Sequence, residues 1–141
     1  MEWLEPKTDW SDKWKNDTYT GDYFTHTDYN RIKNNVSYIV DYAKQMYSVS
    51  SVSMGTDKEE TSIPYADEFN KIENAINKLC AETYKFDFAM KTWYENKSTP
   101  TADDLNRIES MQLRLYEMLV AQRTAQRRLA FRLGSQKGIK V

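Results

Sequence analysis

One short phrase occurs three times in the chain, and it constrains the fold more than any other feature. Aligned on an asparagine, it runs acid, large apolar residue, Asn, base, Ile, charge, and it appears as "DYNRIK", "EFNKIE" and "DLNRIE". The three asparagines, Asn30, Asn70 and Asn106, are 40 and 36 residues apart. A period of this size is typical of a repeated structural unit. A chain of 141 residues can hold three such units within one domain.

Each copy of the phrase has the features of a helix start. Thr25 stands three residues before Asp28, and Thr101 stands three residues before Asp104. A Thr hydroxyl can accept a hydrogen bond from a free amide of the first turn, and an acid is favoured at the positive end of the helix dipole. The second copy is preceded by other start signals, namely Ser62, Pro64 and Asp67. We therefore expect a helix to begin at each copy.

The apolar residues that follow each start recur every three or four positions, as on one face of a helix. The stripes are Tyr29, Ile32, Val36, Ile39, Val40, Ala43 and Met46; then Phe69, Ile72, Ile76, Leu79, Cys80 and Tyr84; then Leu105, Ile108, Met111, Leu115, Met118 and Leu119. An apolar stripe on a helix must be covered by another element. The sequence predicts an all-α fold, with a helical domain over residues 25–134 and three main helices at about 26–47, 65–86 and 102–133.

The polar residues inside the repeated phrase are candidate motif residues. They are Asn30, Arg31, Asn70, Lys71, Asn106 and Arg107. Each Asn lies one turn into its helix, where its amide can bridge backbone or neighbouring helices, and each base lies at the edge of the apolar stripe. Three near-copies argue against a single active site, so we interpret the phrase as a rule for helix packing. A ligand-binding Asn-Arg site is the alternative.

Residues 1–24 form an arm rich in aromatic residues and without a helical pattern, for which we predict an irregular structure with a short helix near 11–16. Its candidate contact residues are Trp3, Trp10, Trp14, Tyr23 and Phe24. Exposed aromatic side chains need a surface to cover them. That surface is either the chain's own helices or a neighbouring subunit. Because aromatic anchors dominate interfaces, we expect the three tryptophans to make docking contacts.

Two linkers separate the predicted helices. Residues 48–63 are rich in Ser and Thr and predict a long loop, in which "SVSSVSM" can form a short strand. Residues 94–100 form the second linker. The helix that follows is long and is expected to stop at Gly134.

This third helix carries a heptad pattern. Ile108, Leu115, Gln122 and Leu129 occupy one row, and Met111, Met118 and Ala125 occupy the next. A lone polar residue in such a seam, here Gln122, can determine register or oligomer number. The helix either packs along the other two helices or forms a coil with a second copy.

Charge is unevenly distributed, although the formal net charge of −1 selects no class of partner. Residues 1–30 hold seven acids and three lysines, whereas the last nineteen residues are basic, with a short tail at 135–141. The basic residues there are Arg123, Arg127, Arg128, Arg132, Lys137 and Lys140. Contact between an acidic arm and a basic end suits an assembly protein. Nucleic-acid binding through the four arginines is the competing interpretation.

The sequence lacks the patterns that support catalysis or cofactor binding. With one His and one Cys, a typical zinc site is not expected, and no phosphate-binding loop or nucleophile elbow occurs. Cys80 is expected to be a small buried residue. No apolar run is long enough for a membrane span, and the acidic start does not resemble a signal peptide. We predict no enzyme activity, no cofactor, no metal and no membrane contact.

One segment resembles a known group of proteins. Trp3, Pro6 and the run "KTDW" at residues 7–10, followed by "DYF" at 22–24 and "DYNRI" at 28–32 with Asn35, resemble a recurrent segment of phage and prophage structural proteins from Gram-positive hosts. The resemblance covers roughly residues 3–47. It implies a small virion protein of the tail, baseplate or neck that is made in the host cytoplasm. Such a protein works by assembly with other virion proteins and as a homo-oligomer.

Two other functions remain open at this point. A DNA-packaging accessory protein would use the basic end of the third helix to bind nucleic acid. A regulatory helical protein would bind a host factor. We expect the structural role because the resemblance and the helical pattern both favour it.

Overall fold

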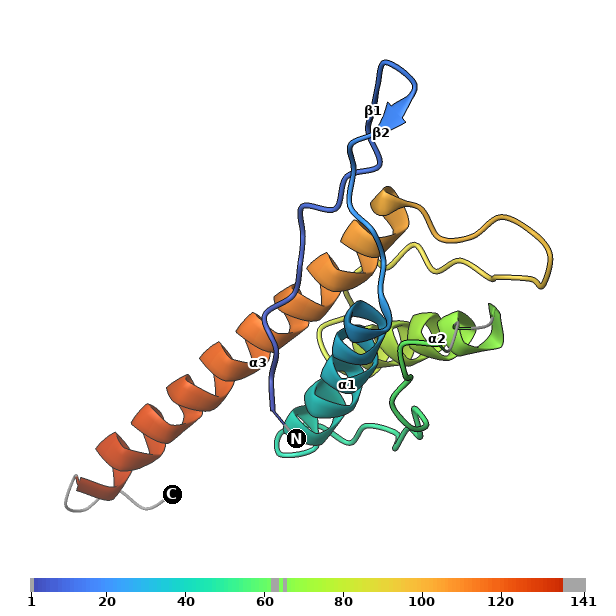
Figure 1. Cartoon of the computed structure of the whole chain (residues 1–141). Coiled ribbons are helices and arrows are strands. Elements are labelled where there is room, and N and C mark those ends of the chain that lie inside the picture. The colour runs from blue at the N-terminus through green and yellow to red at the C-terminus, as the bar shows by residue number, and fades with distance from the viewer. Residues whose placement is uncertain (1, 62–63, 65, 136–141) are drawn as a thin grey trace.

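Three helices and a small β-hairpin make up the regular structure of the chain (Figure 1). The computed structural model describes residues 2–61, 64 and 66–135, with side chains described as far as residue 131. The elements are β1 (Trp14–Lys15), β2 (Thr18–Tyr19), α1 (His26–Ala43), α2 (Ala66–Glu82) and α3 (Ala102–Ser135). The predicted helical fold, with three main helices and a long last helix, is confirmed, although the all-α prediction did not include the small hairpin.

The first two helices end earlier than the apolar spacing predicts. After α1 the amides of Met46 and Tyr47 both bond to the carbonyl of Ala43, which turns the chain out of the helix. After α2, Lys85 has a positive φ of 57° and its amide bonds to the carbonyl of Cys80, an arrangement that closes a helix C-terminus. The apolar pattern continues beyond both ends because Met46 after α1 and Tyr84 after α2 still pack against the core.

The helix starts follow the predicted capping. At α1 the hydroxyl of Thr25 accepts from the amide of Asp28, and the Asp28 carboxylate accepts from the amide of Thr25. Thr101 and Asp104 make the same reciprocal pair at α3, with bonds of 2.9 and 3.3 Å. At α2, Asp67 lies in the first turn as expected, whereas Ser62 lies outside the described residues.

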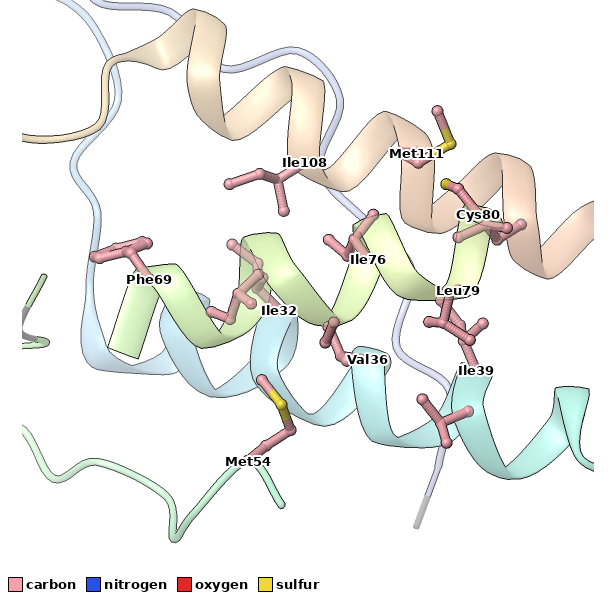
Figure 2. Packing of buried hydrophobic residues seen from close by; sticks show 14 of the residues in the cluster. Ile32, Val36, Ile39, Met54, Phe69, Ile76, Leu79, Cys80, Ile108 and Met111 are labelled. Atoms are coloured by element: carbon pink, nitrogen blue, oxygen red, sulfur yellow. The ribbon is translucent and has the colours of Figure 1, made fainter. Parts of the chain in front are cut away.

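The three apolar stripes pack against one another, as predicted (Figure 2). Met118 is the exception, because its side chain is 43% exposed although the spacing places it in the third stripe. Ile32 from α1, Ile76 from α2 and Ile108 from α3 are each fully buried. The loop after α1 adds Met54 to the core. The predicted strand within this loop is wrong. Ser50 donates its amide and hydroxyl to the carboxylate of Glu82 instead of pairing with another strand.

The arm contains a hairpin where a short helix was predicted at residues 11–16. Trp14 pairs with Tyr19 across an antiparallel turn, and Asn16 and Asp17 have positive φ values of 49° and 61°. Asn and Asp tolerate this backbone conformation, which matches the twist of a tight hairpin. The rest of the arm runs alongside α3 (Figure 1).

The last part of α3 extends beyond the other helices (Figure 1). All eight residues from 124 to 131 are exposed. The helix continues to Ser135, one residue past the predicted stop. In the described part of the chain, none of the helices has the length and apolarity to cross a membrane.

Candidate functional site

The asparagine of each repeated phrase holds an extended segment of the chain by two hydrogen bonds. At Asn106, the side-chain oxygen accepts from the amide of Trp10 at 2.7 Å and the side-chain nitrogen donates to the Trp10 carbonyl at 3.0 Å. Asn70 holds Trp93 in the same way at 2.7 and 2.9 Å, and Asn30 holds Lys58 at 2.7 and 2.9 Å. We call these three pairs of bonds the asparagine clamps. The prediction that the amide bridges backbone is confirmed.

A clamp satisfies both backbone groups of the residue that it holds. The Asn amide offers one acceptor and one donor side by side, as a neighbouring β-strand would. Each such bond contributes a net of about 0.5–1.5 kcal/mol. Asn35, which is fully buried and lies outside the repeated phrase, holds Leu4 in the same way at 3.1 and 2.8 Å. The arm is thus pinned to α1 at Leu4 and to α3 at Trp10.

A buried glutamate accompanies two of the clamps, three residues after the asparagine. Glu109 accepts from the indole of Trp10 at 2.5 Å, from the amide of Lys7 at 3.1 Å and from the guanidinium of Arg31 at 2.8 and 2.9 Å. Its side chain is fully buried. The indole, the amide and the guanidinium all donate hydrogen bonds, so the buried negative charge of the carboxylate is satisfied.

Glu73 repeats this arrangement on α2. It accepts from the indole of Trp93 at 2.8 Å, from the amide of Lys91 at 3.3 Å and from the guanidinium of Arg107 by two bonds of 2.6 Å. This carboxylate is also fully buried. Neither the two glutamates nor Trp93 is among the functional residues predicted from the sequence. The signal for them was the recurrence of Lys-Thr before a tryptophan, as "KTDW" and "KTW".

The bases of the phrase connect one helix to the next. Arg31 of α1 binds Glu109 of α3, and Arg107 of α3 binds Glu73 of α2. The same relation between α2 and α1 would join Lys71 to Lys33, because Lys33 occupies the position that a glutamate has in the other two copies.

The first copy of the phrase has a reversed charge at this position. Lys33 is buried and donates to the carboxylate of Asp57 at 2.6 Å and to the carbonyl of Gly55 at 3.2 Å. Asp57 comes directly before Lys58, the residue held by this clamp. Lys71 is exposed. The first copy therefore uses a lysine–aspartate pair where the second and third copies use a glutamate with tryptophan and arginine.

The two arginines remain charged in this setting. Burial lowers the pKa of Arg31, but hydrogen bonds and charge from Glu109 and Asp28 outweigh it and raise the pKa overall. The pKa of Arg107 is raised in the same way, against burial, by Glu73 and Asp104. Replacing one partner of a buried pair leaves an uncompensated charge, which is strongly destabilising. The motif residues thus form a structural frame, and the clamp asparagines use their amides on the chain's own backbone.

Three of the five predicted docking residues of the arm pack within the chain. Trp10 is only 7% exposed, and Trp3 stacks on Tyr116 with ring centroids 4.0 Å apart. Phe24 contacts Trp10 and Phe69. The prediction that Trp3, Trp10 and Phe24 are docking contacts is therefore corrected, because their faces are already covered by α1, α2 and α3.

The other two aromatic residues of the arm are exposed. Trp14 is 69% exposed and Tyr23 is 74% exposed. Some aromatic residues of the arm are thus covered by the chain's own helices, and others remain free to contact a neighbouring surface. Trp3 and Trp10 before the hairpin and Phe24 after it pack on their own chain. Trp14 in the hairpin and Tyr23 after it present their rings to the outside.

Gln122 lies where the covered part of α3 ends. Its side-chain oxygen accepts from the hydroxyls of Tyr47 and Tyr84, which follow α1 and α2. Burial is the main cause that raises the pKa of Tyr84 to about 12. In the heptad row, Ile108 and Leu115 are fully buried on one side of Gln122. The polar residue predicted to determine an oligomer is used inside the chain.

The basic end of α3 is open to the outside. Arg123 is partly buried, whereas Arg127 and Arg128 are exposed beside Leu129 and Phe131, which are 58% and 78% exposed. The side chain of Arg132 and the tail after residue 135 lie outside the described residues.

Comparisons with models of protein families, with curated proteins and with solved structures found no match. Within residues 2–61, 64 and 66–131, no group of three or more His, Cys, Asp or Glu side chains is arranged to hold a metal ion. The candidate functional surfaces are therefore defined by geometry: the exposed hairpin and the exposed end of α3.

Proposed function

We propose that the chain is a structural subunit of a phage particle, in the tail, baseplate or neck, and that it acts by protein–protein contact. The observation that carries this proposal is the exposed end of α3. Eight consecutive helical residues there have no cover from the described part of the chain, and they include Leu129 and Phe131. A helix of this length gains little stability in water without packing. A partner that covers it supplies that packing.

The rest of the chain supports the same role. The asparagine clamps and the buried pairs at Glu73 and Glu109 join the arm, the loops and the three helices into one frame. A frame of this kind holds exposed contact residues at fixed positions, which lowers the entropic cost of binding. The resemblance of residues 3–47 to phage structural proteins supplies the particle as the setting. In that setting the chain is made in the host cytoplasm and resides in the virion.

The proposal is tested on purified particles of the phage or prophage that encodes the chain. Quantitative mass spectrometry of particles treated with nuclease and washed in high salt is expected to find the chain at a fixed ratio to the other virion proteins. A chain found only in the particle-free lysate contradicts the proposal.

A second candidate function rests on Arg127 and Arg128, which are exposed on α3 with no acid from residue 123 to residue 131. A cationic helix end of this kind can bind nucleic acid through phosphates. The large apolar residues beside the arginines favour a protein partner instead. Titration of the chain into duplex DNA at low and moderate salt separates the two functions, because phosphate binding weakens steeply with salt.

A further inference from the structure

The hairpin and the segment just after it present three aromatic rings in a row. Trp14 and Tyr19 meet edge to face with centroids 5.3 Å apart, and Tyr19 and Tyr23 do so at 5.2 Å. Trp14 and Tyr23 are 69% and 74% exposed. We call Trp14, Tyr19 and Tyr23 the ring surface. Large exposed rings of this kind are the usual anchors of protein interfaces.

Polar bonds hold Tyr19, the middle ring of the ring surface, in place. The hydroxyl of Tyr19 lies 2.5 Å from the carbonyl of Asp22 and 3.2 Å from that of Ser11. The Asp22 carboxylate accepts from the amide of Ser11 at 2.9 Å. A Cβ on Gly21 would collide with the Tyr19 hydroxyl, so glycine is required for this close approach. Tyr19 therefore loses little entropy on binding, and the rings of Trp14 and Tyr23 pack against it.

Charges on the hairpin are sorted by strand alternation, which places residues two apart on the same side. Trp14 pairs directly with Tyr19, so these rings share one side of the hairpin. Asp12 lies two residues before Trp14 and falls on the ring side. Lys13 and Lys15 fall on the opposite side. The ring surface therefore has an acid beside it and no lysine from the strand that carries Trp14.

The exposed end of α3 has the complementary chemistry. Thr124, Arg127, Arg128 and Phe131 line a shallow hollow on one face of the helix. Their spacing of three and four residues places them together. A guanidinium binds well both to the face of an aromatic ring and to a carboxylate. We call Arg127, Arg128 and Phe131 the α3-end surface.

We propose that the ring surface of one copy of the chain docks on the α3-end surface of a second copy. The hairpin lies beside the start of α3, at the opposite end of the molecule from the exposed end of the helix (Figure 1). A helix of 34 residues is about 50 Å long, so one copy cannot join its own two surfaces. The contact is therefore head to tail, and it builds a ring or a filament. This inference deepens the proposed function by naming a second copy as the partner.

The test uses two variants that each remove one surface. In the first, Trp14→Ala and Tyr23→Ala remove the ring surface. In the second, Arg127→Glu and Arg128→Glu reverse the α3-end surface. By light scattering, the wild-type chain is expected to exceed the monomer mass of 16.7 kDa, and each variant alone is expected to remain at that mass. A mixture of the two variants is expected to form a dimer, because each retains the surface that the other lacks.

Matched controls separate the proposed contact from general effects. Tyr94→Ala removes an aromatic residue that is 66% exposed elsewhere, and Lys71→Glu with Lys78→Glu reverses two exposed charges on α2. Both controls are expected to assemble like the wild type, and circular dichroism is expected to show equal helix content in all variants.

Several outcomes would overturn the inference. The first is a wild-type chain that stays monomeric at about 100 μM, roughly 100 times a Kd of about 1 μM. The others are single variants that assemble normally and a mixture of the two variants that stays monomeric. If the chain assembles only when DNA is added, and the Arg127→Glu and Arg128→Glu variant loses that assembly, the α3-end surface binds nucleic acid instead. Each of these results leaves the particle measurement unchanged, so failure of the head-to-tail contact is distinguishable from failure of the proposed function.

Discussion

Replacing Glu109 with alanine is the most informative perturbation of the frame. Its fully buried carboxylate accepts hydrogen bonds from the Trp10 indole, the Lys7 amide and the Arg31 guanidinium. The Glu109→Ala variant leaves the indole N–H without an acceptor and the guanidinium with Asp28 as its remaining partner. The arm and α1 both lose their tie to α3 at this point.

The expected cost follows from these contacts. Breaking a buried ion pair by removing one partner costs about 3–5 kcal/mol. Arg31 keeps its bond to Asp28, and its side chain is 15% exposed, so water compensates for part of the loss. We therefore expect the lower end of the range, about 3 kcal/mol. An unfolding entropy of about 2.1 cal/mol/K per residue makes this a fall of about 10 °C in Tm for a chain of 141 residues.

Urea unfolding followed by tryptophan fluorescence measures this change, because Trp10 and Trp93 are bonded to the two buried glutamates. The matched control is Glu117→Ala, which removes an exposed glutamate from the same helix and is expected to change stability by less than about 0.5 kcal/mol. If Glu109→Ala unfolds within about 0.5 kcal/mol of this control, the reasoning about the buried glutamate is refuted.

Three further predictions concern single groups. Burial raises the pKa of the Cys80 thiol from 9.0 to about 11, so its thiolate is about 100-fold scarcer at pH 8. Iodoacetamide should therefore label the native chain about 100-fold more slowly than the urea-unfolded chain. Equal labelling rates by mass spectrometry would contradict this prediction. Desolvation raises the pKa of Asp104, but hydrogen bonds from Lys91 and Thr101 outweigh it and hold the pKa below 3.8. The ionised Asp104 carboxylate therefore stabilises the fold above about pH 3.8, and this stabilisation is lost as the pH falls through the folded-state pKa. Asp104→Asn should flatten the acid side of a curve of unfolding free energy against pH. An unchanged slope would count against this assignment. Gln122→Leu removes the acceptor of two tyrosine hydroxyls and should cost about 1–3 kcal/mol in urea unfolding, whereas no change would show that water replaces the amide.

Local signals account for what the sequence predicted correctly. The caps at Thr25 and Thr101 and the apolar spacing after each start depend on residues within a few positions of one another. Helix starts, helix number and the core stripes were therefore accessible. Helix ends were not, because Lys85 stops α2 by a backbone conformation that no apolar pattern reveals.

Long-range pairing explains what the sequence did not predict. Arg31 and Glu109 are 78 residues apart, and Trp10 and Asn106 are 96 apart. Each residue looks like an ordinary surface or motif position until the fold brings its partner to it. For this reason the sequence predicts an external docking role for Trp10, although Trp10 is buried in the core of its own chain.

The hairpin was missed for a different reason. Its strands are two residues long, too short to show alternation, and the arm's turn signal lay in Asn16 and Asp17 alone. The heptad pattern of α3 was visible, but it could not show that Gln122 marks the boundary between the covered and exposed parts of the helix.

Amide hydrogen exchange of the full chain tests the central claim most directly, namely that the asparagine clamps tie the arm and loops into one frame. The amides of Trp10, Lys58 and Trp93 each donate to a clamp asparagine, and the amide of Leu4 donates to Asn35 in the same way. They are predicted to exchange as slowly as amides within the covered part of α3. If these four amides exchange at the rate of an unstructured loop while the helices remain protected, the clamps do not hold the chain and the account is wrong.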